Sequence, residues 1–243
     1  MHWRDEAIII GTRRHGENHV IAEVFTRDHG RWRGMVHGGA GRRKRAWLQA
    51  GNVARAEWRA RTPEQLGTLA LEPAAQHAAG ALENRVALAA LQAVVAALAL
   101  CPEREAHPRL FDGATLVLAH LDAPLSCTAL LARFELALLA ELGYGLDLSR
   151  CALTGASDDL AWVSPRTGRA ASRQAGAPWA DRLLALPAFL HAHNAPPPSV
   201  ADIAAGLRLT AHFLTNRLFA PQGKALPAAR LRLPELLSKS AEE

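Results

Sequence analysis

This sequence of 243 residues has few lysines, few cysteines and no long apolar run. No stretch of about 18 uncharged apolar residues occurs, as a membrane-spanning helix would need. The first ten residues, MHWRDEAIII, carry acids and an arginine where a signal peptide needs an apolar core. These absences argue against a membrane span and a secretory leader, and we expect a soluble, cytoplasmic protein.

Metal-binding and disulfide patterns are also missing. The three cysteines, Cys101, Cys127 and Cys151, are too few and too widely spaced for a disulfide framework or a paired metal motif, so we expect reduced thiols. His191 and His193 have a ligand-like spacing, but no third ligand lies at a natural distance along the chain, and a structural or surface role is favoured. The sequence therefore predicts no metal and no cofactor.

Arginine is what the sequence has in excess, because it supplies 25 of the 28 basic residues. Residues 1–61 hold 13 Lys+Arg against 6 Asp+Glu, a net charge of +7, whereas the rest of the chain carries 15 against 17. Clustered cations raise the local potential toward phosphate. The first segment is therefore predicted to bind a polyanion.

The first third of the chain has the two-residue period of β-strands. Turn residues at Gly16 and at 28–30 separate the first strands. Strands of this size suit a small, five-stranded antiparallel barrel of the oligonucleotide-binding (OB) type, which we assign to residues 1–80. The expected strands lie within residues 6–14, 19–27, 31–37, 52–60 and 65–72.

After Leu82 the apolar residues recur at helical intervals. The third helix has Ser126 or Thr128 as an expected cap and Gly143 at its end. The sequence thus predicts an α+β protein, with a mainly α-helical domain over residues 81–243 and a turn-rich insertion at about 150–178. The expected helices lie near residues 86–98, 108–121, 126–142, 180–193 and 199–218.

The segment RWRGMVHGGAGRRKRAW, residues 31–47, combines arginines, glycines and two tryptophans without a carboxylate. Arginine pairs with phosphate through a planar fork, glycine lets backbone amides approach a phosphate chain, and an exposed indole stacks on a base. Nucleic acid is therefore the favoured ligand, although basic runs are often merely solvated and tryptophan packs a core as readily as it stacks. The candidate contacts are Arg14, Arg31, Trp32, Arg33, Arg42, Arg43, Lys44, Arg45 and Trp47.

No catalytic constellation is recognisable. No glycine-rich loop is followed by Lys-Ser or Lys-Thr. His15 and Glu17 crowd a turn, but no nucleophile is tied to them, so a hydrolase or transferase ranks last and we expect no enzyme. An RNA-binding or ribosome-associated OB-fold module is the alternative, since the basic segment would serve it equally well.

Several blocks, in a fixed order, resemble the RecO family of bacterial DNA repair proteins. The resemblance covers nearly the whole chain, and it implies an OB-fold barrel, a helical domain and no enzymatic turnover. The blocks are AIII at 7–10, RHGE at 14–17, VFTRDHG at 24–30, GGA at 38–40, LQAG at 48–51, RFEL at 133–136, LGYGLDL at 142–148, and Cys151.

The resemblance also implies partners and a location near the bacterial nucleoid. Members bind single- and double-stranded DNA, anneal complementary strands and, with RecR and RecF, help RecA replace the single-stranded-DNA-binding protein. They also bind that protein's acidic C-terminal tail. An apolar group edged by a cation on the central helix would suit such a tail, although an ordinary helix core explains it equally well. The residues concerned are Leu131, Arg133, Phe134, Leu138 and Leu142.

The sequence departs from the family in one feature, the four-cysteine zinc module that many members carry after the central helix. Cys151 is present, but the other positions fall at Thr154, Ser172 and Ala175. One thiolate cannot hold a structural zinc ion that needs four ligands. We therefore expect a degenerate zinc-module-like insertion without metal.

Overall fold

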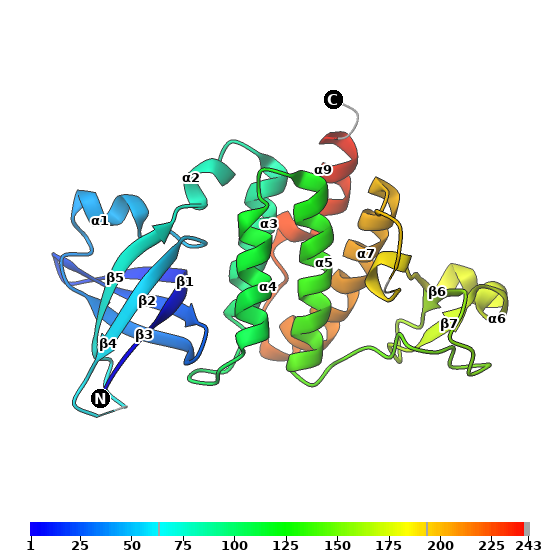
Figure 1. Cartoon of the computed structure of the whole chain (residues 1–243), viewed down its shortest axis with the longest axis horizontal. Coiled ribbons are helices and arrows are strands. Elements are labelled where there is room, and N and C mark those ends of the chain that lie inside the picture. Colours follow the sequence, from blue (N-terminus) through cyan, green and yellow to red (C-terminus); the bar gives the residue numbers. More distant parts are fainter. Residues whose placement is uncertain (63, 193, 241–243) are drawn as a thin grey trace. The chain divides into compact units, whose positions relative to one another are not determined.

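The computed structural model of the chain describes residues 1–62, 64–192 and 194–240 (Figure 1). These residues form two compact units: unit 1 is Met1–Asp122, and unit 2 begins at Ala123. A five-stranded barrel is followed by mostly helical structure, which confirms the predicted α+β class. Within the described ranges, no helix is both long and apolar enough to cross a membrane.

The barrel of unit 1 contains all five predicted strands, with the first beginning earlier than expected. The barrel is closed in the order β1-β2-β3-β5-β4. Neighbouring strands are antiparallel, except that β3 meets β5 in parallel at Met35 and Thr68. The strands are β1 His2–His15, β2 His19–Thr26, β3 Gly30–Val36, β4 Val53–Arg59 and β5 Thr68–Ala75.

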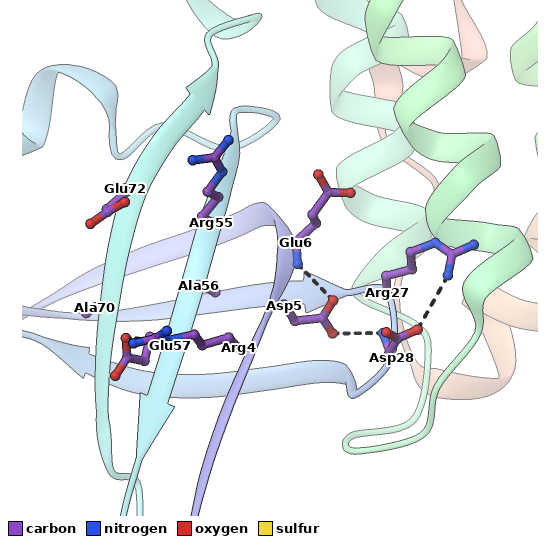
Figure 2. A pocket seen from close by; sticks show the side chains of 10 residues that line it. All are labelled: Arg4, Asp5, Glu6, Arg27, Asp28, Arg55, Ala56, Glu57, Ala70 and Glu72. Atoms are coloured by element: carbon purple, nitrogen blue, oxygen red, sulfur yellow. Dashed lines mark hydrogen bonds and ion pairs between the residues drawn. The ribbon is translucent and has the colours of Figure 1, made fainter.

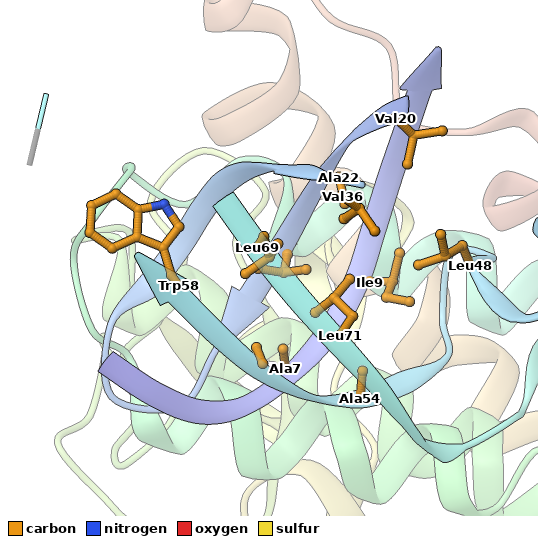
Figure 3. Packing of buried hydrophobic residues seen from close by; sticks show 12 residues of the cluster. Ala7, Ile9, Val20, Ala22, Val36, Leu48, Ala54, Trp58, Leu69 and Leu71 are labelled. Atoms are coloured by element: carbon orange, nitrogen blue, oxygen red, sulfur yellow. The ribbon is translucent and has the colours of Figure 1, made fainter. Parts of the chain in front are cut away.

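The barrel core takes one face from each strand (Figure 3). On β2 the inward residues are Val20, Ala22 and Val24, as the predicted alternation requires. The opposite face of β2 is buried as well, at Ile21 and Phe25. Glu23 lies between them on the same face, is only partly buried and pairs with Arg31, so this face of β2 is covered without being apolar throughout.

Glycine is required at two positions on β3. A Cβ added at Gly34 would lie 2.6 Å from the Cβ of Leu69 on β5. At Gly30 φ is +69°, and an added Cβ would lie 1.8 Å from the carbonyl oxygen of Glu105. Both positions therefore depend on the missing side chain, and Gly30 also depends on the left-handed backbone that glycine tolerates.

Unit 1 continues beyond the barrel through helices α2 (Ala78–Ala81), α3 (Arg85–Leu98) and α4 (Pro108–Ala119). Asn84 caps α3 by accepting hydrogen bonds from the amides of Val86 and Ala87. Arg27 at the end of β2 makes a bidentate pair with Asp112 on α4, at 3.0 and 3.1 Å. These contacts place residues 82–122 in the same compact unit as the barrel, whereas the sequence predicts a boundary near residue 80.

Unit 2 is built around three helices, α5 (Pro124–Glu141), α7 (Val200–Phe213) and α9 (Leu233–Ser240). A π-helical turn, η3 (Leu214–Phe219), continues α7, and α8 (Ala228–Leu231) precedes α9. A small sheet in the order β7-β6-β8 begins within the predicted insertion at 150–178 and extends beyond it, because β8 lies after residue 178. Its elements are β6 Leu160–Val163, β7 Ala170–Ser172, α6 Arg173–Gly176 and β8 Leu184–Ala185.

The predicted helix over 180–193 is wrong. The chain there forms the short 3-10 helices η1 (Ala177–Arg182) and η2 (Ala188–Leu190), with β8 between them. Pro187 accounts for the break, because proline disfavours helical backbone in the residue before it. His193, the second histidine of the possible metal pair, lies outside the described residues.

The two ends of the central helix differ in how well the sequence predicts them. Gly143 has a φ of +83° directly after α5 and confirms the expected left-handed ending. The predicted caps Ser126 and Thr128 are wrong, because α5 begins at Pro124 without a side-chain cap. Thr128 instead donates its hydroxyl to the Pro124 carbonyl at 2.6 Å.

Candidate nucleic-acid interface

The basic run 42–45 lies on a short helix that the strand pattern does not predict. Helix α1 (Arg42–Trp47) follows Gly41 and contains no buried residue. Arginine, lysine and alanine are good helix formers, so this insertion between β3 and β4 can coil locally. Its cationic side chains therefore face solvent on an ordered element.

The glycine turn before α1 uses its own amides. Gly38 donates to His19 Nδ1 at 3.2 Å, and Gly39 donates to the Val36 carbonyl at 3.2 Å. Ala40 donates to Asn18, and Gly41 donates to Gly38. These amides are therefore not free to meet a phosphate chain, in contrast to what the sequence suggests for the glycine backbone.

Unpaired arginines collect at the end of the barrel that carries α1 and the β1–β2 turn. Arg13 and Arg14 are exposed at the end of β1, and Arg42, Arg43 and Arg45 are exposed on α1. In the described part of the chain, no carboxylate lies within ion-pair distance of any of these five. We call this group, together with Lys44, the basic end of the barrel.

Two adjoining recesses lie within the basic end. One, of about 360 Å³, is bordered by Thr12, Arg14, Arg45 and Gln49. The second, of about 430 Å³, shares Arg45 and Gln49 and adds Arg42. Three free guanidinium groups thus line neighbouring hollows, which suits phosphate groups of one chain.

Arg31 and Arg33, which the sequence predicts as contacts, are already paired. Arg31 lies 2.6 Å from Glu23 and 3.6 Å from Glu103. Arg33 pairs with the same Glu103. Their charges are largely neutralised inside unit 1, so phosphate would have to displace carboxylates.

The two tryptophans proposed for stacking are partly buried. Trp32 packs edge-on against Trp58 and Trp3, with ring centroids 5.0 and 5.6 Å apart, and Arg104 covers it at 4.8 Å. Trp47 packs against the barrel core. Both indoles are therefore engaged at least in part by packing within unit 1 and are not the fully exposed rings that stacking on bases would favour.

The outer surface of β1, β4 and β5 is hollowed into a groove of about 660 Å³, but its charges are mixed (Figure 2). Five of its lining residues are acidic and three are arginines. Hydrogen bonds from Arg59, and then from Arg4 and His2, lower the pKa of Glu57. With more acidic than basic side chains in its lining, the groove is unsuitable for a phosphate chain.

The residues predicted for tail binding do not form one exposed patch. Leu131, Phe134 and Leu138 are buried in unit 2. Arg133 is exposed, and its Nε donates to the Phe189 carbonyl at 3.1 Å. Leu142 is half-buried at the end of α5. Only Arg133 and Leu142 remain accessible to a peptide.

The donors around Cys151 do not fit a zinc ion. Burial raises the pKa of the Cys151 thiol, but hydrogen bonds from the Thr154 hydroxyl and from the amides of Ser172, Leu153 and Thr154 lower it to about 6. The sulfur is thus already surrounded by hydrogen-bond donors. No group of three or more His, Cys, Asp or Glu in the described residues could hold a metal.

The sequence pattern does not single out Arg13, the helix α1 or the two histidines His19 and His37 at the same end, and it notes His15 only as a residue that crowds a turn with Glu17. A signal is present for the first, because Arg13 stands beside another arginine where β1 meets a turn. The histidines are separated by up to 22 positions in the sequence, and only the strand register brings them together.

Comparison with known proteins agrees with this architecture. Residues 1–76 match the family described as "Recombination protein O N terminal", and residues 82–226 match "Recombination protein O C terminal". The DNA repair protein RecO of Chelativorans sp. (strain BNC1) is 49% identical over 230 residues, covering 95% of this chain and 93% of that protein.

Two further relatives carry the same description, DNA repair protein RecO. That of Beijerinckia indica is 50% identical, over 95% of this chain and 92% of the relative. That of Methylorubrum populi is 46% identical, over 97% and 98% respectively. The chain therefore belongs to the RecO family of DNA repair proteins, which are non-enzymatic recombination mediators.

Proposed function

We propose that the chain binds single- and double-stranded DNA through the basic end of the barrel, anneals complementary strands, and helps load RecA onto DNA covered by the single-stranded-DNA-binding protein. The observation that carries the proposal is the group of five exposed guanidiniums that have no carboxylate partner among the described residues. A free cation that neutralises a phosphate releases a counterion from the DNA, and this release favours binding. A cation that is already paired must first give up its carboxylate partner, which reduces the gain.

The electrostatics support binding that follows the backbone and tolerates any base sequence. Arg14, Arg42 and Arg45 border adjoining recesses, so a bending phosphate chain can contact them in succession. The tryptophans are engaged in packing, which leaves charge as the main source of affinity. Annealing follows from the same charge, because cations lower the repulsion between two approaching phosphate chains.

The test is a titration of fluorescent single-stranded DNA at several salt concentrations with the wild type and a variant in which Arg42, Arg43, Lys44 and Arg45 are all changed to Ala. We expect weaker binding and a salt slope flatter by about 0.7 for each phosphate that the variant no longer neutralises. A matched control replaces three exposed arginines and a lysine of unit 2, namely Arg150, Arg166, Arg208 and Lys239. An equal reduction in affinity for the two variants, or none for the first, would overturn the proposal.

Partner binding is proposed on the family relationship. RecR, RecF and the acidic tail of the single-stranded-DNA-binding protein are the expected partners. For the tail, Arg133 offers an exposed cation and Leu142 an accessible apolar side chain. Reversing the charge with Arg133→Glu should weaken binding of an acidic tail peptide if this surface is used, while Arg232→Glu, on another exposed arginine of unit 2, should not.

A further inference from the structure

Three histidines from separate strands gather at the basic end of the barrel. His15 ends β1 and stands opposite His19, the first residue of β2, in the strand register. His37 follows β3, and its ring meets that of His19 edge-on, with centroids 4.9 Å apart. His15 and His37 are exposed, and His19 is partly exposed. We call these residues the histidine cluster.

The chemical state of His19 is fixed by the glycine turn. Its Nδ1 accepts the amide proton of Gly38 at 3.2 Å, and only an unprotonated nitrogen can accept. The neutral ring must then carry its proton on Nε2. His19 is therefore placed to donate a hydrogen bond from Nε2 to a phosphate oxygen without gaining charge.

The other two imidazoles are free to gain a proton. His15 has no side-chain hydrogen bond among the described residues. His37 Nε2 has only the Thr68 hydroxyl, at the long distance of 3.5 Å. An imidazole without such bonds can take up a proton when negative charge is brought beside it.

The groups around the cluster are mostly cations. Arg13 and Arg14 precede His15 on β1, and Lys44 of α1 donates to the His37 carbonyl at 2.8 Å. Glu17, exposed in the β1–β2 turn, is the acid nearest in sequence. A phosphate chain drawn to these cations brings negative charge beside the imidazoles and favours their protonated form.

We infer that the histidine cluster is part of the DNA contact and that binding takes up protons, with His15 and His37 becoming cationic and His19 acting as a neutral donor. The inference rests on the proposed function of the basic end. If the complex holds more protons than the free protein, the affinity for DNA should rise as the pH falls from 8 to 6.

The test uses a fluorescent oligothymidylate, whose bases do not titrate between pH 6 and 8, at constant ionic strength. For the wild type we expect tighter binding at pH 6 and a salt slope steeper there by about 1.4, which is about 0.7 for each new imidazolium contact. The double variant H15Q/H37Q should lose this pH dependence. H120Q, on a histidine at the end of α4 whose Nδ1 lies 2.9 Å from the Leu116 carbonyl, should keep it.

Calorimetry in two buffers with different ionisation enthalpies gives an independent readout. For the wild type the observed binding enthalpy should depend on the ionisation enthalpy of the buffer in the sense of net proton uptake, and for H15Q/H37Q this dependence should be lost. The inference is overturned if wild-type affinity is the same at pH 6 and 8, or if H15Q/H37Q retains the full dependence. Failure of the proposed function gives a different result. In that case the variant with Arg42, Arg43, Lys44 and Arg45 all changed to Ala would bind DNA as tightly as the wild type at both pH values.

Discussion

Arg230 holds Glu135 through two parallel hydrogen bonds inside unit 2, with Nε 2.6 Å from Oε1 and Nη2 2.6 Å from Oε2. Both side chains are buried, at 0% and 1% exposure. Thr210 donates its hydroxyl to the same carboxylate, so the pair joins α5, α7 and α8. Glu135 belongs to the RFEL block at 133–136, and its part in that block is structural.

Removal of either partner should destabilise unit 2 strongly. Glu135→Ala or Arg230→Ala leaves an uncompensated buried charge, and we expect the free energy of unfolding to fall by about 3–5 kcal/mol. Urea denaturation measures the change. Arg232→Ala, at an exposed neighbour, should cost less than about 0.5 kcal/mol. Similar decreases for Arg230 and Arg232 would show that the buried pair has no special importance.

In unit 1, the side chain of Asn52 joins three segments of the chain by hydrogen bonds and should contribute to stability. Its side-chain oxygen accepts from the amides of His77 and Ala78, at 2.8 and 2.9 Å, and its nitrogen donates to the Trp47 carbonyl at 2.8 Å. Asn52→Ala leaves these partly buried groups without their partner, and we expect the free energy of unfolding to fall by about 1–3 kcal/mol. Asn18→Ala, in the exposed turn, is the control. A negligible change at Asn52 would mean that water replaces its bonds.

The division into units can be tested by limited proteolysis of the whole chain. Glu103 pairs with Arg31, and the Arg104 amide donates to the Arg31 carbonyl at 2.9 Å, so the segment after α3 is joined to the barrel. We expect a protected N-terminal fragment that ends near Asp122. A fragment that ends near residue 80 would instead support the boundary predicted from the change in sequence period.

The strands and most helices can be predicted because their signals are local. Alternation on β2 and helical spacing in α3 and α5 depend on which residues face the core, and a single segment displays that pattern. The prediction of a helix over 180–193 fails because its composition is apolar while Pro187 interrupts the backbone. Helix α1 escapes prediction because it is short and has no fully buried residue, so no apolar period marks it.

The candidate site is harder to predict, since pairing between distant residues decides which cations are free. Arg33 and Arg45 look alike in the sequence. Arg33 is neutralised by Glu103, which lies 70 residues away in the sequence. Arg45 has no carboxylate partner among the described residues. The histidine cluster is equally invisible in the sequence, because strand register and a turn bring its members together.

Free and paired arginines should therefore differ in their effect on DNA binding. Arg14→Ala with Arg45→Ala should weaken binding of single-stranded DNA and flatten the salt slope by about 1.4, or about 0.7 for each contact. The second double variant, Arg31→Ala with Arg33→Ala, removes the same formal charge but leaves Glu23 and Glu103 without their partners. Because these two arginines are paired with carboxylates, we expect this variant to change the salt slope of DNA binding less than the first. A larger effect from the second pair would move the interface to β3.

The insertion in unit 2 offers a test by pH, because Cys151 has a pKa of about 6 in the folded protein. An ordinary thiol in an unfolded chain has a pKa of about 8.5. Between these values the folded state has released a proton that the unfolded state still holds. Stability therefore rises with pH across this window; the contribution is fully present above the unfolded value and disappears as pH falls through the folded value.

Replacement of the thiol should remove this dependence. The difference in unfolding free energy between the wild type and Cys151→Ala should increase from pH 6 to pH 9, measured by urea denaturation under reducing conditions. Thr154→Val removes one hydrogen-bond donor to the sulfur but keeps the thiol, so the pKa of Cys151 in the folded state should rise. The pH range over which stability depends on Cys151 should then begin at a higher pH. If the wild type and Cys151→Ala differ by the same amount at pH 6 and pH 9, the sulfur is held as a neutral thiol. In that case the hydrogen bonds around it do not stabilise a thiolate, and Cys151 contributes to the insertion by packing alone.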